Sequence, residues 1–210
     1  ITGILIVLGF FIFASASLGY LAREQNIFSS IFVNQLVSLG IGVVALLVAT
    51  QIKPTFWNKH AFFIFLGSLI ATLLVFIPML GGEHGGAKRW LWLGGVSFQP
   101  SELLKFGFII YYAAWCAGVR DKIRTMKYGI LPLILLIALA ALILVFQPDF
   151  GTLIIITIGA MSVFFASGAS WKHILSIIGV GIAGILIVGT FVPYVKDRLL
   201  TFVDPGRDPL

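Results

Sequence analysis

The chain has 210 residues, of which 60% are hydrophobic and 10% are charged, with a formal net charge of +6. Soluble domains carry about 25% charged residues, so the composition excludes an ordinary soluble protein and indicates burial in lipid. The basic excess fits the loops that orient membrane helices better than nucleic-acid binding, and the single cysteine, Cys116, excludes an internal disulfide.

The chain contains seven apolar stretches, each close to the roughly 20 residues that span a bilayer. We therefore predict an all-α, polytopic helix bundle with about seven spans, forming a single integral membrane domain over residues 1–210. The first stretch has no basic start, so we expect a span within a longer protein rather than a signal peptide. The predicted spans cover 1–21, 31–50, 61–80, 101–119, 129–146, 151–166 and 174–192.

Two connections between these spans contain residues that start or interrupt helices. A glycine-rich loop with Lys88 and Arg89 runs into Pro100, where the fourth span begins. The fifth and sixth spans are separated at Pro148, which cannot continue an ordinary helix. Asp149 is a natural helix cap there, with Thr152 three residues further on.

Alternate loops should lie on opposite sides of the membrane. One set carries seven basic residues against Asp121 alone, and the other carries six basic and six acidic residues. The positive-inside rule counts Lys and Arg, and the tight cluster 120–127 leads us to place the first set in the cytoplasm. The glycine-rich loop, the Asp149 corner and the tail 193–210 should then share the outer face.

Glu102 and Lys105 are ionisable residues in the first turns of the fourth span. Positions three apart share one helix face, so the two side chains can pair. Charges in a membrane helix usually face a cavity or each other, and we predict that this pair faces the bundle interior. It is either a structural ion pair or the polar floor of a substrate cavity, and the spacing leaves both interpretations open.

On the predicted outer face, Lys88, Arg89, Arg198 and Arg207 offer cations for phosphate. The run GGEHGG lacks the lysine and hydroxyl of a P-loop. Trp90 and Trp92 could stack on a sugar, but interfacial anchoring explains them as well. His84 has no second His or Cys nearby, so we expect no metal site there, and turn formation explains Asp204 and Asp208.

Three segments of the chain resemble the SEDS family (shape, elongation, division and sporulation), represented by FtsW and RodA. They are GAKRWLWLGGVSFQPSELLKF at 86–106, QPDFGT at 147–152 and RLLTFVDPGRDP at 198–209. The resemblance covers the whole chain in order, and SASLGY at 15–20 is similar to the division-type members. The sequence does not decide between division, elongation and sporulation.

The resemblance implies a multi-pass peptidoglycan glycosyltransferase of about ten spans in the bacterial plasma membrane. Such enzymes join lipid II at the outer leaflet: an acceptor hydroxyl attacks the donor's anomeric carbon and lipid diphosphate leaves. The implied partners are a class B penicillin-binding transpeptidase, other division or elongation proteins and membrane lipids, with no nucleic acid. No cofactor is certain, and a divalent cation stays open.

The resemblance also sets the candidate residues. We take the substrate or cavity residues to be Lys88, Arg89, Gln99, Glu102, Lys105, Asp149 and Arg198. The family's presumed catalytic Asp lies in an HTDF-like motif after the segment that matches 204–209. We therefore expect that acid beyond Leu210 and no catalytic acid within this chain. A lipid-precursor flippase or transporter, or a non-catalytic division scaffold, remains the alternative.

Overall fold

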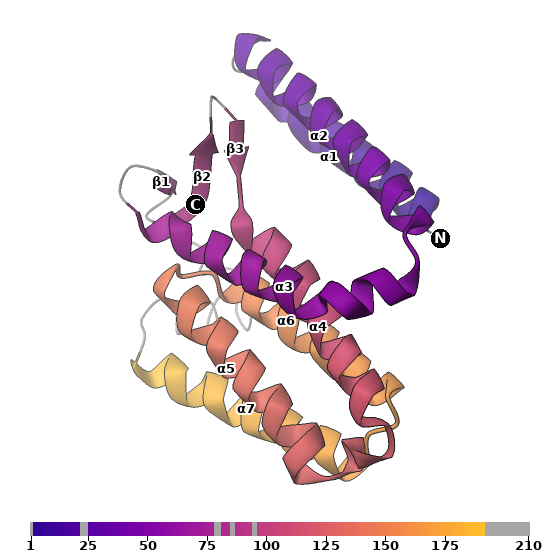
Figure 1. Cartoon of the computed structure of the whole chain (residues 1–210). Coiled ribbons are helices and arrows are strands. Elements are labelled where there is room, and N and C mark those ends of the chain that lie inside the picture. Colours follow the sequence, from indigo (N-terminus) through magenta and orange to yellow (C-terminus); the bar gives the residue numbers. More distant parts are fainter. Residues whose placement is uncertain (1, 22–24, 78–80, 85–86, 94–95, 192–210) are drawn as a thin grey trace. The chain divides into compact units, whose positions relative to one another are not determined.

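A computed structural model describes residues 2–21, 25–77, 81–84, 87–93 and 96–191, which form seven α-helices and a three-stranded sheet (Figure 1). The chain divides into two compact units, residues 1–56 and 57–210.

The first unit is a pair of helices, α1 (Thr2–Leu21) and α2 (Gln25–Gln51), which pack against each other along their length (Figure 1). Large apolar side chains such as Ile12 and Ile41 are exposed on this pair. Lipid tails, unlike water, solvate such a surface without cost, which agrees with two membrane helices. Both helices fall where spans were predicted.

Helix α3 (Pro54–Leu73) begins and ends earlier than the span predicted at 61–80. Pro54 occupies the first helical position, where its fixed φ favours the helix and its missing N–H is not needed. A short 3-10 turn, η1 (Leu74–Phe76), ends this segment.

A small antiparallel sheet replaces the predicted glycine-rich loop. Its strands, in spatial order, are β1 (Gly81–His84), β2 (Ala87–Leu93) and β3 (Val96–Phe98). Leu91 pairs with Gly81 on one side and with Phe98 on the other. Gly81 is required because a Cβ there would collide with the backbone carbonyl of Val75 in η1, so the sheet is fixed closely against the end of the α3 segment.

The remaining helices largely confirm the predicted spans. They are α4 (Pro100–Val119), η2 (Arg120–Arg124), the π-turn η3 (Met126–Ile130), α5 (Leu131–Phe146), α6 (Phe150–Ala166) and α7 (Trp171–Phe191). α6 packs against α4, α5 and α7, and the core includes Leu104, Phe108, Leu133 and Phe164.

Small residues allow the helices of this unit to approach closely. A Cβ on Gly107 of α4 would come within 2.5 Å of Ser68 Oγ in α3, and Ala140 of α5 and Ala160 of α6 are fully buried. Such positions are typical of membrane helix interfaces, where packing rather than water drives association.

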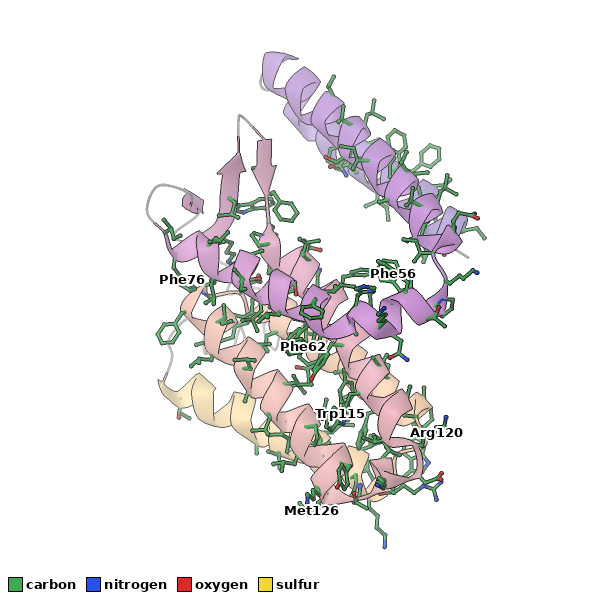
Figure 2. The ribbon with its side chains drawn as sticks, viewed as in Figure 1. Phe56, Phe62, Phe76, Trp115, Arg120 and Met126 are labelled. Carbon is green, nitrogen blue, oxygen red and sulfur yellow. The ribbon has the colours of Figure 1, made fainter. Side chains whose placement is uncertain are left out.

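Outward faces carry large apolar side chains, among them Phe62 and Met126, both labelled in Figure 2. Three segments of the described chain are long and apolar enough to cross a membrane, 54–76, 100–124 and 126–146, and three shorter apolar helices accompany them. The predicted class, an all-α polytopic bundle, is confirmed; the count of seven spans stays a prediction.

Candidate functional site

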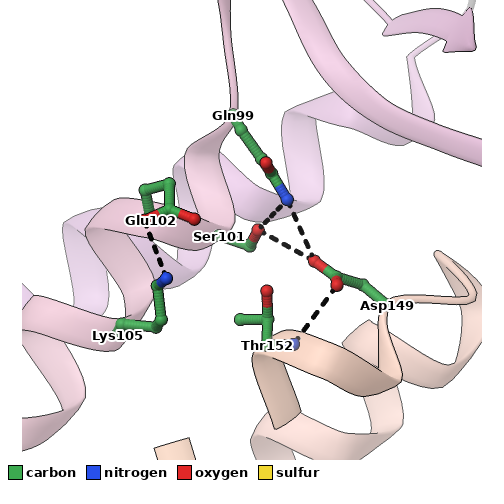
Figure 3. Close-up of polar contacts among 6 residues, drawn as sticks. All are labelled: Gln99, Ser101, Glu102, Lys105, Asp149 and Thr152. Atoms are coloured by element: carbon green, nitrogen blue, oxygen red, sulfur yellow. Dashed lines mark hydrogen bonds and ion pairs between the residues drawn. The ribbon is translucent and has the colours of Figure 1, made fainter. Parts of the chain in front are cut away.

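Asp149 is a buried carboxylate at the start of α6. Its Oδ1 accepts a hydrogen bond from the backbone N–H of Thr152, 3.3 Å away, so the predicted cap is confirmed. Its Oδ2 accepts from Ser101 Oγ at 3.0 Å and from Gln99 Nε2 at 3.2 Å (Figure 3). Side-chain atoms 48 and 50 residues away in the sequence therefore meet at one carboxylate.

The entrance to α4 supplies the partners of Asp149. Gln99 follows β3 in extended backbone and Pro100 begins the helix, which turns Ser101 inward. Gln99 Nε2 also donates to Ser101 Oγ over 3.0 Å. The three polar side chains form a closed network that joins the end of the sheet, α4 and α6.

Arg89 connects the sheet to the same corner. From β2, its Nε donates to the backbone carbonyl of Gln147 at 3.1 Å, and its Nη2 donates to that of Pro148. The turn 147–149 leaves these carbonyls outside any helical ladder, because Pro148 interrupts the helix. The guanidinium is thus held over the break between α5 and α6.

Gln147 is almost fully buried and fixes the same corner to α3. Its Nε2 donates to the backbone carbonyl of Thr72 at 2.8 Å, and Thr72 Oγ1 in turn donates to the carbonyl of Ser68. A buried amide without a partner would be costly, so this bond ties α3 to the break between α5 and α6.

Glu102 and Lys105 form the predicted ion pair, with Oε2 and Nζ 2.8 Å apart (Figure 3). The predicted inward orientation is wrong for the described chain, because the Glu102 side chain is 55% exposed and that of Lys105 is 24% exposed. The buried stripe of α4 includes Ser101, Leu104 and Phe108. Each charged residue lies one position later, about 100° around the helix, and therefore on the flank of that stripe.

These contacts give Arg89 and Asp149 different chemical roles at this corner. An arginine side chain has five N–H donors, and among the described residues two of those of Arg89 have acceptors, both of them backbone carbonyls. No carboxylate in the described part pairs with it. By contrast, both oxygens of Asp149 are occupied. Arg89 is therefore suited to bind an anion, and Asp149 to hold the corner together.

The candidate residues fall into two groups. The structure brings together Arg89, Gln99 and Asp149, with the Glu102–Lys105 pair on the adjoining turn of α4. The side chain of Lys88 and the whole of Arg198 lie outside the described residues, as does the predicted tail up to Leu210. The expectation that the catalytic acid lies beyond Leu210, and not within this chain, therefore stays a prediction.

Sequence reasoning missed the roles of Ser101, Gln147 and Thr72. A usable signal existed, because each is a hydrogen-bonding residue within or beside an apolar run, and two of them adjoin Pro100 and Pro148. Polar groups in such places must find partners, but the sequence does not name the partner.

The opposite end of this unit carries the basic cluster. Arg124 Nε donates to the backbone carbonyl of Gly168 at 3.1 Å, so the turns that follow α4 and α6 lie together. The sheet and the 147–149 turn meet at the other end through Arg89. The predicted separation of basic and polar loops onto two ends is confirmed for these segments, and their sidedness stays a prediction.

Comparisons with known proteins give a consistent assignment. A sequence model of the FtsW, RodA and SpoVE family, described as a cell cycle protein, matches residues 1–210. A probable peptidoglycan glycosyltransferase FtsW of Allochromatium vinosum is 33% identical over 82% of this chain and 43% of its own length. The FtsW of Saccharophagus degradans, with the same description, is 31% identical over 96% of this chain and 52% of its own length.

Solved structures share the fold. A chain of a peptidoglycan synthase complex, studied for the structural coordination of polymerization and crosslinking, superposes with a TM-score of 0.73 at 26% identity, covering 99% of this chain and 60% of that one. The rod shape determining protein RodA of Thermus thermophilus gives 0.66 at 27% identity, covering 87% and 57%. The chain spans about half the length of the sequence relatives it matches.

Proposed function

Because this chain belongs to the FtsW, RodA and SpoVE family, we propose that the protein it forms part of is a peptidoglycan glycosyltransferase. It polymerises lipid II into glycan strands at the outer face of the bacterial plasma membrane. An acceptor sugar hydroxyl attacks the anomeric carbon of the donor, and the lipid diphosphate leaves.

Arg89 carries this proposal. Its guanidinium is held by two backbone carbonyls, and the described residues offer it no carboxylate. Its remaining donors and its full charge are therefore available to an oxyanion. Arginine suits phosphate because its planar fork donates two parallel hydrogen bonds. The diphosphate of lipid II is an anion of this kind, and its charge grows as the sugar departs, where fixed cations lower the barrier.

The Gln99–Ser101–Asp149 network positions this arginine. It fixes the N-terminus of α6 and hence the two carbonyls that hold Arg89. We assign Asp149 a structural role rather than that of the general base, because it is buried and three donors already bond to its oxygens. We place the base in the large outer loop of the family, beyond Leu210, as the resemblance implies.

The proposed setting includes partners and a membrane. The protein is a multi-pass membrane protein, and we place it in the plasma membrane, where lipid II is displayed. A crosslinking partner, a class B penicillin-binding transpeptidase, is supported by the solved complex that coordinates polymerization with crosslinking. The exposed apolar faces of the helices leave ample surface for a partner's membrane helix.

The experiment is lipid II polymerisation by the full-length protein with and without its transpeptidase. Glycan strands should form with wild-type protein, and Arg89→Gln should lower the rate while the protein still accumulates in membranes. Lys59→Gln, which removes an exposed charge elsewhere, is the matched control. Translocation of fluorescent lipid II across vesicles without any polymer would instead identify a flippase, and neither activity would identify a scaffold.

A further inference from the structure

A groove lies along the outward faces of α6 and α7. Its volume is about 440 Å³, and most of its wall is apolar. Phe165 and Trp171 meet at one end with ring centroids 5.0 Å apart. The lining residues include Thr157, Met161, Ser162 and Phe165 of α6, and Trp171 and Ile178 of α7.

The end of the groove marked by Phe165 and Trp171 opens at the basic end of this unit. Both residues flank the turn 167–170, and Arg124 donates to the carbonyl of Gly168 within that turn. Lys172 is exposed and follows Trp171 directly. Two cations are therefore carried by the segments next to this end of the groove: Arg124 is bonded to the turn 167–170, and Lys172 adjoins the lining residue Trp171.

Acids are scarce at this end of the described chain, where Asp121 of η2 is outnumbered by Arg120, Lys122 and Arg124 of the same turn. Between Glu102 and Asp197 the sequence holds only Asp121 and Asp149 as acids, and Asp149 is at the opposite end. Lys122 and Lys127 both lie over the ring of Tyr128, at 5.4 and 5.6 Å from its centroid, and add further positive charge. The described residues of this end contain no ion pair.

We propose that this groove is a binding site for an anionic phospholipid of the phosphatidylglycerol type. One acyl chain lies along α6 and α7, and the phosphate is bound at the mouth by Arg124 and Lys172. Basic pockets between membrane helices recognise anionic headgroups in this way. A zwitterionic lipid brings its own cation to the mouth and would be disfavoured there, so charge complementarity selects the occupant.

The test uses the full-length protein in phosphatidylcholine vesicles that contain brominated phosphatidylglycerol or, separately, brominated phosphatidylcholine. Bromine on an acyl chain quenches tryptophan at contact, and the part due to Trp171 is the difference between wild type and Trp171→Phe. At equal mole fraction, brominated phosphatidylglycerol should quench Trp171 more strongly. Equal quenching by the two lipids would overturn the proposal.

Variants separate the mouth from the groove. Lys172→Gln or Arg124→Gln should each lower the preference for phosphatidylglycerol about fivefold, whereas Lys59→Gln, on a different turn, should leave it unchanged. Ser162→Phe fills the groove and should reduce quenching by both lipids. Equal losses with Lys59→Gln and Lys172→Gln, or no effect of Ser162→Phe, would contradict the site.

An independent measurement is the melting temperature of the detergent-solubilised wild type. Phosphatidylglycerol should raise it more than phosphatidylcholine does, and the absence of that difference would also count against the site.

Discussion

Ser101 Oγ donates a hydrogen bond to Asp149 Oδ2 over 3.0 Å, and this bond joins the first turn of α4 to the first turn of α6 (Figure 3). Both residues are buried, and both directly follow a proline. The two motifs that carry the family resemblance, at 86–106 and 147–152, are thus two sides of one contact.

Asp149→Ala should destabilise the protein, because it removes a helix cap and leaves the buried hydroxyl of Ser101 without its acceptor, whereas Gln99 keeps Ser101 Oγ as an acceptor. Caps contribute about 0.5–2 kcal/mol, and each stranded buried donor costs about 1–3 kcal/mol. Thermal unfolding in detergent measures the change. Asp121→Ala, at an exposed carboxylate, is the control, and equal melting temperatures for the two variants would count against the network.

Arg89→Lys should reduce lipid II polymerisation nearly as much as Arg89→Gln, because lysine keeps the charge but not the planar fork. Loss of one transition-state donor typically lowers the rate by about a hundredfold or more. Initial rates of glycan synthesis, read with membrane yield, separate this loss from misfolding. Full activity of Arg89→Gln would show that the guanidinium takes no part in catalysis.

Glu102→Gln and Lys105→Met should each lower membrane yield, and the double variant should recover part of it. A lone charge in a membrane helix costs roughly 2.5–3.5 kcal/mol at mid-depth, and less near the interface. Glu102 lies in the first turn of α4, near one end of the span, which predicts a loss at the low end of that range. Additive effects in the double-mutant cycle would show that the ion pair contributes nothing.

If the pair also belongs to the substrate cavity, glycan synthesis should stay low in the double variant even where yield returns. If its role is structural, activity should return with yield. Measuring the two quantities separately on the same preparations distinguishes these outcomes.

Gly107→Leu should disrupt the contact between α3 and α4, because even a Cβ there would press on Ser68 Oγ and lie 3.1 Å from the Ile64 carbonyl. Overpacking of this kind costs about 1–3 kcal/mol. Gly118→Leu on the same helix is the matched control, since a Cβ there meets nothing within 4 Å. Thermal unfolding of the two variants should differ clearly, and equal values would mean that the helices can separate without penalty.

Single cysteines in a Cys116→Ser background should report the sidedness of the two ends. Ser97→Cys and Lys127→Cys are both at exposed positions. An impermeant thiol reagent added to intact cells should label position 97, because the sheet is predicted to be external, and should spare position 127. The reverse pattern would invert the proposed topology.

The sequence alone determined the class of the protein and most of its helices, because a run of about 20 apolar residues has few alternatives to a membrane helix. It also located the break at Pro148 and the cap at Asp149, since both depend on local chemistry within a few residues. The start of α3 and the sheet at 81–98 were missed: Pro54 and the glycines were interpreted as loop signals, and strand pairing depends on residues that local periodicity does not connect.

The partners of Asp149, the acceptors of Arg89 and the bond from Gln147 to Thr72 were decided only by the tertiary structure. Each joins residues at least 48 positions apart, and no local rule selects among the polar groups that could satisfy a buried donor. The same holds for the flank position of Glu102 and Lys105: spacing predicted that they would meet, but the packing of α4 against its neighbours determined which face was buried.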